Sequence, residues 1–139
     1  MTRIFLFLIL IIAFPLISVV AIFIALVDGF PVFFRQKRMG INGKSFIMYK
    51  FRTMVRGADA LQKKYARQNE ADRPVFKIRE DPRFTRMGRF LSHTGLDELP
   101  QLWNIWRGDM ALFGPRPLPI AEAGKLTKQQ QEDTALKMG

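Results

Sequence analysis

Two adjacent carboxylates, Asp97 and Glu98, are the residues of this sequence best suited to chemistry. They precede a predicted short helix, and acids near a helix N-terminus stabilise it by about 0.3–1 kcal/mol, so their spacing alone favours a structural role. Arginine binds phosphate oxygens through paired hydrogen bonds. A carboxylate can hold Mg²⁺ beside a phosphate or attack phosphorus. A phosphate site therefore competes with the structural explanation, because basic residues lie on both sides along the chain: Lys50, Arg52, Arg83, Arg86, Arg89, Arg107 and Arg116.

Arg116 stands between two prolines in residues 114–117, Gly-Pro-Arg-Pro. Because proline fixes its own backbone angle, this segment predicts a guanidinium that is held in place before a ligand binds. A structural turn with a solvated arginine explains the same residues equally well.

Composition removes several classes of site. The chain has no cysteine and a single histidine, His93, which excludes disulfides, thiolate metal sites and multi-histidine metal sites. A Ser-His-Asp triad would have to use His93, and no nucleophile motif accompanies it. The net charge of +10 predicts an anionic partner, such as a phosphorylated substrate, an anionic lipid or a nucleic acid.

The first residues form an uncharged apolar run from 4 to 27, interrupted only by Pro15 and Ser18. It exceeds the roughly 20 helical residues that cross a bilayer, and it is too long for a signal peptide and lacks a clear cleavage site. Pro15 lies at its middle and removes one helical hydrogen bond. Two topologies follow: a straight span with its ends on opposite faces, or a helix broken at Pro15 that returns to the same face. Pro15 alone does not decide between them.

The remaining elements predict an α+β fold, mainly helical. Residues 31–38 and 45–53 are predicted strands, and Asn42 with Gly43 is a turn signal that joins them into a hairpin. Apolar spacing predicts helices, Pro100 suits a helix start and Gly108 a helix end. The predicted helical ranges are 58–68, 83–91, 100–107 and 120–138, with a short strand at 75–78.

An ordered set of motifs resembles the bacterial sugar transferase family, the monotopic phosphoglycosyl transferases. The resemblance extends from about residue 3 to residue 119. It rests on Gly29, on Pro31-Val32-Phe33-Phe34-Arg35-Gln36, on Lys50-Phe51-Arg52-Thr53-Met54, on Asp81-Pro82-Arg83, on Leu96-Asp97-Glu98-Leu99-Pro100-Gln101-Leu102-Trp103-Asn104, on Gly108-Asp109-Met110 and on Gly114-Pro115-Arg116-Pro117.

This resemblance implies a reaction and a topology. The family transfers a phosphosugar from a UDP-sugar to polyprenol (undecaprenyl) phosphate, releases UMP and uses Mg²⁺, as the first membrane step of exopolysaccharide, capsule, O-antigen or glycan synthesis. Its first helix is re-entrant and broken at a proline, which matches Pro15. Residues 1–28 are then the membrane-embedded helix-hairpin. Residues 29–139 form the catalytic domain at the cytoplasmic face of the bacterial inner membrane, where bacterial lipids and a homo-oligomer are further partners.

The resemblance also implies residue roles. Asp97 is the expected nucleophile, which forms a covalent intermediate and contacts the metal. Glu98 is its expected partner, and Arg116 is expected to bind the nucleotide or a phosphate. Lys50 and Arg52 are expected to support substrate binding.

Three departures from the family pattern keep an alternative open. Ser92 replaces an arginine five residues before Asp97, so weaker phosphate binding is expected unless Arg89 or His93 substitutes. An acidic residue is missing near Leu6. The catalytic domain is also expected to be truncated at its C-terminal end. The alternatives are a catalytically impaired membrane scaffold and, on charge alone, a membrane-tethered nucleic-acid-binding module, for which no recognised motif exists.

Overall fold

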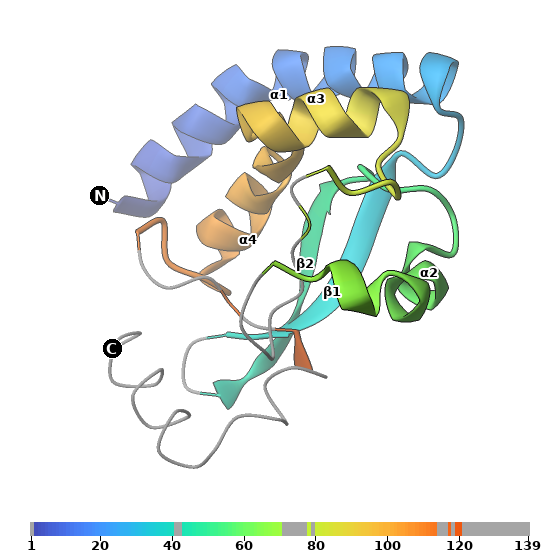
Figure 1. The fold of residues 1–139 in the computed structure, drawn as a ribbon. Coiled ribbons are helices and arrows are strands. Elements are labelled where there is room, and N and C mark those ends of the chain that lie inside the picture. Colours follow the sequence, from blue (N-terminus) through green and yellow to red (C-terminus); the bar gives the residue numbers. More distant parts are fainter. Residues whose placement is uncertain are drawn as a thin grey trace.

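A long helix lies along a small α+β domain in the computed structural model, which describes residues 2–40, 43–70, 78, 80–113, 117 and 119–120. Figure 1 shows α1 beside α3 and above α4, with a two-stranded hairpin below them. The elements are α1 (Thr2–Val27), β1 (Phe33–Met39), β2 (Ser45–Phe51), α2 (Ala58–Lys64), η2 (Ala66–Gln68), α3 (Arg86–Thr94), η3 (Leu96–Glu98) and α4 (Gln101–Arg107). The predicted α+β class is confirmed.

Helix α1 continues through Pro15 without a change of secondary structure. Ser18 Oγ donates to the carbonyl oxygen of Phe14 at 2.9 Å. The part Arg3–Val27 is long and apolar enough to cross a membrane, and most of its surface is not buried. The predicted long apolar helix is therefore present, and the predicted break at Pro15 is not confirmed.

Both halves of α1 contact the same domain. Near its C-terminal end, Val20 and Ile24 are buried in the core together with Phe51 and Leu91. Near its N-terminal end, the ring of Phe7 packs against Trp106 of α4, with ring centroids 5.6 Å apart. The helix is thus laid along the domain at both ends.

The predicted hairpin is confirmed. Strands β1 and β2 are antiparallel, with Phe33 opposite Phe51 and Met39 opposite Ser45. The backbone N–H of Gly40 donates to the Lys44 carbonyl at 2.8 Å, and Gly43 has a φ of 71° that favours glycine. The predicted turn residue Asn42 lies outside the described residues.

The helix predictions hold with shifted limits. The predicted helix 58–68 is divided, because α2 ends at Lys64 and η2 follows. Helix α3 begins at Arg86 rather than at residue 83, because the Thr85 hydroxyl caps it by accepting a hydrogen bond from the Gly88 N–H at 2.9 Å. Helix α4 begins at Gln101, one residue after the predicted start at Pro100, and ends before Gly108, as predicted. Nearly all of the predicted strand 75–78 and helix 120–138 lies outside the described residues.

Candidate active site

Asp97 lies in the short 3-10 turn η3, between α3 and α4. Gly95 ends α3 with a φ of 74°, which reverses the chain and leads it into η3. The Asp97 side chain is almost fully buried, and one of its carboxylate oxygens lies 4.0 Å from Lys50 Nζ. The structure therefore brings together two of the predicted site residues, Asp97 from η3 and Lys50 from β2.

Lys50 connects Asp97 with a cationic pocket. Its Nζ lies 5.6 Å from the ring centroid of Phe34, the residue opposite it on β1. Lys50 also lines a pocket of about 490 Å³ whose walls carry several positive side chains and one carboxylate: Arg38, Lys50, Arg52, Arg56, Arg83 and Asp59. Such a pocket beside a buried carboxylate is suited to an anionic ligand.

Arg52, predicted to support the substrate site, lines this pocket but is held by the end of α1. Its guanidinium donates to the carbonyl oxygens of Asp28, Gly29 and Phe30, at 2.5, 2.9 and 3.1 Å. Arg56 also donates to the Phe30 carbonyl. These carbonyls belong to the segment that follows α1, and hydrogen bonds from a charged guanidinium are stronger than those between neutral groups. Arg52, two residues after Lys50 in the chain, therefore holds the segment that follows the apolar helix in place.

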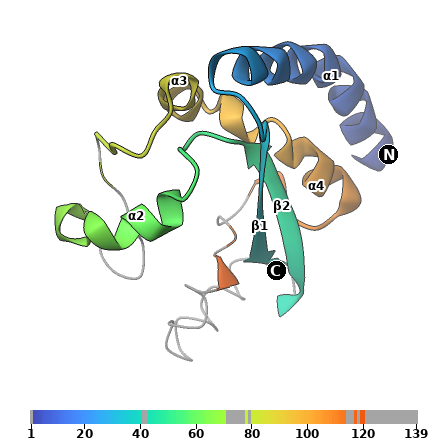
Figure 2. The ribbon, with the colours of Figure 1, turned by 90° about the vertical axis from the view of Figure 1, so that its right-hand side faces the viewer.

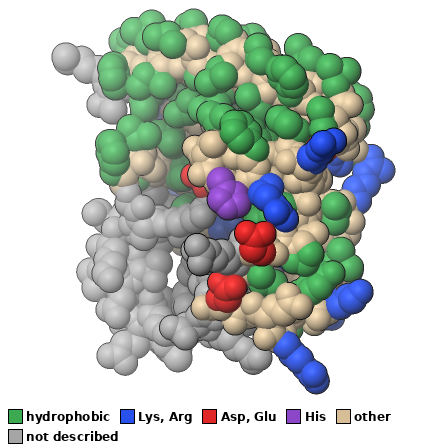
Figure 3. Space-filling model, turned by 45° about the horizontal axis from the view of Figure 1, so that its top comes forward, with side chains coloured by type: hydrophobic (Ala, Val, Ile, Leu, Met, Phe, Trp, Pro, Cys, Tyr) green, Lys and Arg blue, Asp and Glu red, His purple; other side chains and the backbone are tan. Residues whose placement is uncertain are grey.

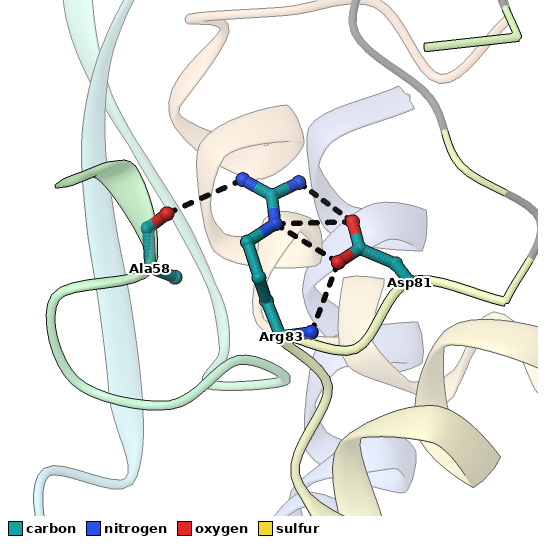
Figure 4. Close-up of polar contacts among 3 residues, drawn as sticks. All are labelled: Ala58, Asp81 and Arg83. Atoms are coloured by element: carbon teal, nitrogen blue, oxygen red, sulfur yellow. Dashed lines mark hydrogen bonds and ion pairs between the residues drawn. The ribbon is translucent and has the colours of Figure 1, made fainter. Parts of the chain in front are cut away.

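A buried ion pair forms another part of the pocket wall (Figure 4). The Arg83 guanidinium binds both carboxylate oxygens of Asp81, the shortest contact being 2.6 Å, and donates to the Ala58 carbonyl at 3.4 Å. Burial raises the pKa of Asp81, but the side-chain and backbone hydrogen bonds from Arg83 and its positive charge outweigh that effect, and the net pKa is lower than the ordinary 3.8. The pair holds the Arg83 cation in a fixed position at the pocket.

Asn104 ends the motif that begins at Leu96 but was assigned no role from sequence, although it fixes the geometry beside Lys50. Its amide nitrogen donates to the Ile47 carbonyl at 2.8 Å and to an Asp109 carboxylate oxygen at 3.1 Å. Its amide oxygen accepts from the Tyr49 N–H at 3.1 Å. Asn104 is fully buried and ties α4 to β2. An asparagine inside a short helix, where its propensity is poor, was the available signal.

The other predicted residues are placed as follows. Glu98 is half-buried next to Asp97 in η3. Arg89 is exposed on α3 and forms an ion pair of 3.3 Å with Glu80, so no described contact brings it to Asp97. Ser92 and His93 are exposed on α3. Arg116 lies outside the described residues, but Arg38 of the pocket donates to the carbonyl of Pro117 at 2.6 Å.

A magnesium site would have few protein ligands here. Within the described residues, no group of three or more His, Cys, Asp or Glu side chains is suitably clustered for a metal. Mg²⁺ commonly binds through one or two carboxylates together with substrate phosphates. Asp97 and Glu98 fit that mode, in which the substrate completes the coordination.

An apolar surface accompanies this polar site. Figure 3 shows hydrophobic side chains gathered over the region of α1, with charged side chains set apart from them. The exposed α1 residues include Ile4, Ile12, Phe14 and Leu26. A large exposed apolar surface of this kind is typical of a membrane-contacting protein.

The sequence model of the bacterial sugar transferase family matches residues 1–139. The chain belongs to this family. It is 40% identical over 112 residues, 81% of this chain and 25% of the relative, to a galactosyl transferase, CpsE, of Streptococcus agalactiae serotype III. It is 44% identical over 95 residues to an undecaprenyl-phosphate galactose phosphotransferase of Salmonella typhimurium, covering 66% of this chain and 20% of that protein.

A third relative has more similar length. It is named a putative undecaprenyl-phosphate N-acetylgalactosaminyl 1-phosphate transferase, of Bacillus subtilis, and is 42% identical over 106 residues, 76% of this chain and 53% of the relative. The chain thus spans from about a fifth to about half of the length of these relatives. The long apolar helix and relatives named for a lipid carrier together indicate membrane association.

Proposed function

We propose that this chain transfers a phosphosugar from a UDP-sugar to polyprenol phosphate, in the first membrane step of a bacterial polysaccharide or glycan. The observation that carries the proposal is the buried Asp97 carboxylate, 4.0 Å from Lys50 at a cationic pocket. The names of the relatives, which include undecaprenyl-phosphate galactose and N-acetylgalactosaminyl 1-phosphate transferases, support the same reaction class.

The reaction has two displacements at one phosphorus. An Asp97 oxygen attacks the β-phosphorus of the UDP-sugar, the bond from that phosphorus to the oxygen it shares with the α-phosphorus breaks, and UMP leaves with that oxygen. An oxygen of polyprenol phosphate then attacks the aspartyl-bound phosphorus. The Asp97–phosphorus bond breaks, which regenerates the carboxylate and gives a polyprenol diphosphate sugar. Covalent catalysis of this type divides one difficult step into two easier ones.

The surrounding residues hold charge in place during these steps. Lys50 balances the Asp97 carboxylate before attack and stabilises the phosphoryl oxygens afterwards. Arg38 and Arg83 face the diphosphate from the pocket wall, and Arg116 and Arg89 remain proposed phosphate ligands. Asp97 and Glu98 would hold Mg²⁺. When bound, this ion would neutralise part of the negative charge of the diphosphate. Glu98 also accepts the proton of an incoming phosphate that arrives protonated.

We further propose that α1 enters the membrane and returns, so that both of its ends and the catalytic domain lie on the cytoplasmic face. The contacts of Phe7 with Trp106 and of Ile24 with the core support this topology. A helix that crossed the bilayer would carry its first turns about 30 Å from the domain. Basic residues beside the apolar helix support the cytoplasmic placement.

The test is UMP release by the chain held in nanodiscs, with polyprenol phosphate, Mg²⁺ and a series of UDP-sugars. We expect release that requires the metal and lipid, and a loss of more than about a thousandfold in Asp97→Asn, because the amide is not a nucleophile. Intact mass after UDP-sugar alone should show one added phosphosugar in the unmodified chain and none in Asp97→Asn.

A matched control is Asp59→Asn, which removes one carboxylate from the same pocket without touching Asp97. Equal activity of Asp97→Asn and the unmodified chain would contradict the proposal. Absence of release in both the chain and its Ser92→Arg variant, with vesicle binding intact, would instead support the scaffold alternative.

A further inference from the structure

The hairpin separates two hollows of different character. Side chains alternate along a strand, and the register places Lys50 opposite Phe34 but Arg35 opposite Tyr49. The face with Lys50 borders the cationic pocket and Asp97. The other face borders a second hollow of about 300 Å³, the lipid-side groove, lined by Leu10, Ile17, Phe33, Arg35, Tyr49, Pro100 and Trp103.

The lipid-side groove is apolar at its walls and positive at one end. Leu10 and Ile17 come from α1 and Trp103 from α4. Figure 2 shows the hairpin between α2 on one side and α4 on the other. Two of the lining residues therefore belong to the long apolar helix, so α1 forms one wall of the groove. An apolar chain from the membrane suits these walls.

The positive end consists of Arg35, whose guanidinium carbon lies 6.0 Å from the centroid of the Tyr49 ring. None of the ion pairs within the described part of the chain includes Arg35. A guanidinium stacked on a ring keeps its edge N–H groups available for a phosphate. Lys37, two residues further along β1, is exposed on the same face. Two cations on one face favour a phosphodiester with net negative charge over a zwitterionic headgroup.

We propose that the lipid-side groove binds one anionic glycerophospholipid, with an acyl chain against Leu10, Ile17 and Trp103 and its phosphodiester on Arg35. Arg35 and Lys50 lie on opposite faces of the hairpin, so a phosphate held by Arg35 does not reach Asp97. The bound lipid is therefore not the acceptor of the reaction. It fills the space between α1 and the hairpin and fixes the domain to the membrane surface.

The test uses Trp103 as a reporter. In a Trp106→Phe background, Trp103 is the only tryptophan. The full chain in non-ionic detergent is titrated with phosphatidylglycerol brominated on its acyl chains, because bromine quenches tryptophan at close range. We expect quenching that saturates at one lipid per chain and is reversed by unbrominated phosphatidylglycerol. Brominated phosphatidylcholine should need a roughly tenfold higher concentration for the same quenching, because the charge-assisted contact is lost.

Matched variants locate the site. Arg35→Gln should raise the half-saturating lipid concentration roughly tenfold or more, and Arg35→Lys by less. Lys63→Gln removes the same charge from an exposed position on α2, across the hairpin, and should leave the titration unchanged. Circular dichroism of each variant verifies folding. If Arg35→Gln does not fold, Arg35→Lys against Lys63→Gln gives the comparison.

Three results would overturn the proposal: equal quenching by both lipid classes, equal titrations of Arg35→Gln and Lys63→Gln, or displacement of the brominated lipid by equimolar polyprenol phosphate. The last result would assign the groove to the acceptor. The readout is fluorescence rather than UMP release, so its failure is distinguishable from failure of the proposed reaction.

Discussion

Lys50 contacts Asp97 and also lines the cationic pocket. Its Nζ lies 4.0 Å from an Asp97 carboxylate oxygen. Lys50→Met keeps much of the side-chain volume and removes the charge. We expect kcat/KM for the UDP-sugar to fall by about 10²–10³, the usual loss when one fixed stabilising group is removed from an active site. Lys50→Arg should recover part of it. Lys44→Met, an exposed lysine at the hairpin turn, is the control for UMP-release kinetics. Similar values for Lys50→Met and Lys44→Met would exclude the role.

The buried Asp81 makes the stability of the protein depend on pH in the acidic range. Its folded-state pKa lies below 3.8 because the contacts from Arg83 outweigh burial. A lowered pKa contributes stability that is present above the ordinary value and is lost as pH falls through the folded-state pKa. We therefore expect the free energy of unfolding to decline below about pH 4, measured by denaturant titration monitored by circular dichroism.

Asp81→Asn separates this pair from other acid effects. The variant leaves Arg83 buried without its carboxylate, which costs about 3–5 kcal/mol near neutral pH. It should also lose the part of the acid slope that Asp81 supplies. Asp59→Asn, at an exposed carboxylate, is the control. An unchanged acid slope in Asp81→Asn would show that other carboxylates produce it.

Among the elements, α4 and β2 depend on one buried amide. Asn104→Ala removes three hydrogen bonds, to Tyr49, Ile47 and Asp109, and leaves buried backbone groups unpaired. Each such group costs about 1–3 kcal/mol, so we expect a loss of roughly 2–4 kcal/mol. Arg107→Ala, at the exposed end of the same helix with a surface ion pair of 3.6 Å, should change stability by less than about 1 kcal/mol. Thermal unfolding in detergent compares the two, and equal losses would contradict the role of Asn104.

Elements with local signals were predictable from sequence, whereas contacts between distant elements were not. The hairpin followed from two strand patterns and a turn, and α4 from Pro100 and Gly108, because these features act within a few residues. Two of the hydrogen-bond partners of Asn104, Tyr49 and Ile47, lie more than 50 residues away in β2. Arg52 was predicted to support substrate but also binds the end of α1. Both depend on chain packing that a linear pattern does not encode.

The candidate site shows the same division. Asp97 and Lys50 were predicted as site residues from residue types and motif order, and the structure places Lys50 Nζ 4.0 Å from an Asp97 carboxylate oxygen. The exact walls of the pocket were not predicted, because the contacts of Arg83 with Asp81 and with the Ala58 carbonyl of α2 depend on the tertiary packing of the chain. Pro15 likewise indicated a position where α1 lacks one backbone hydrogen bond. Whether the helix breaks there depends on the residues that pack against it.

At the scale of the whole molecule, α1 and the domain form one body. The apolar helix rests on α4 through Phe7 and on the core through Val20 and Ile24. Its remaining surface is apolar and exposed. The Asp97 carboxylate is therefore held at a fixed position relative to this apolar surface, which suits the proposed reaction between a water-soluble donor and a lipid acceptor.

This arrangement predicts that both ends of α1 lie on the cytoplasmic side. The chain has no cysteine, so single cysteines report without background. Thr2→Cys and Lys44→Cys place one label site at the start of α1 and one in the domain. In intact spheroplasts, a membrane-impermeant maleimide should modify neither site, and after permeabilisation it should modify both. A straight span would expose Cys at position 2 to the outside and would leave only the domain site protected. Modification of position 2 in intact spheroplasts would therefore contradict the proposed re-entrant topology. Equal protection of both sites would support it, as expected from the Phe7–Trp106 contact between the start of α1 and α4.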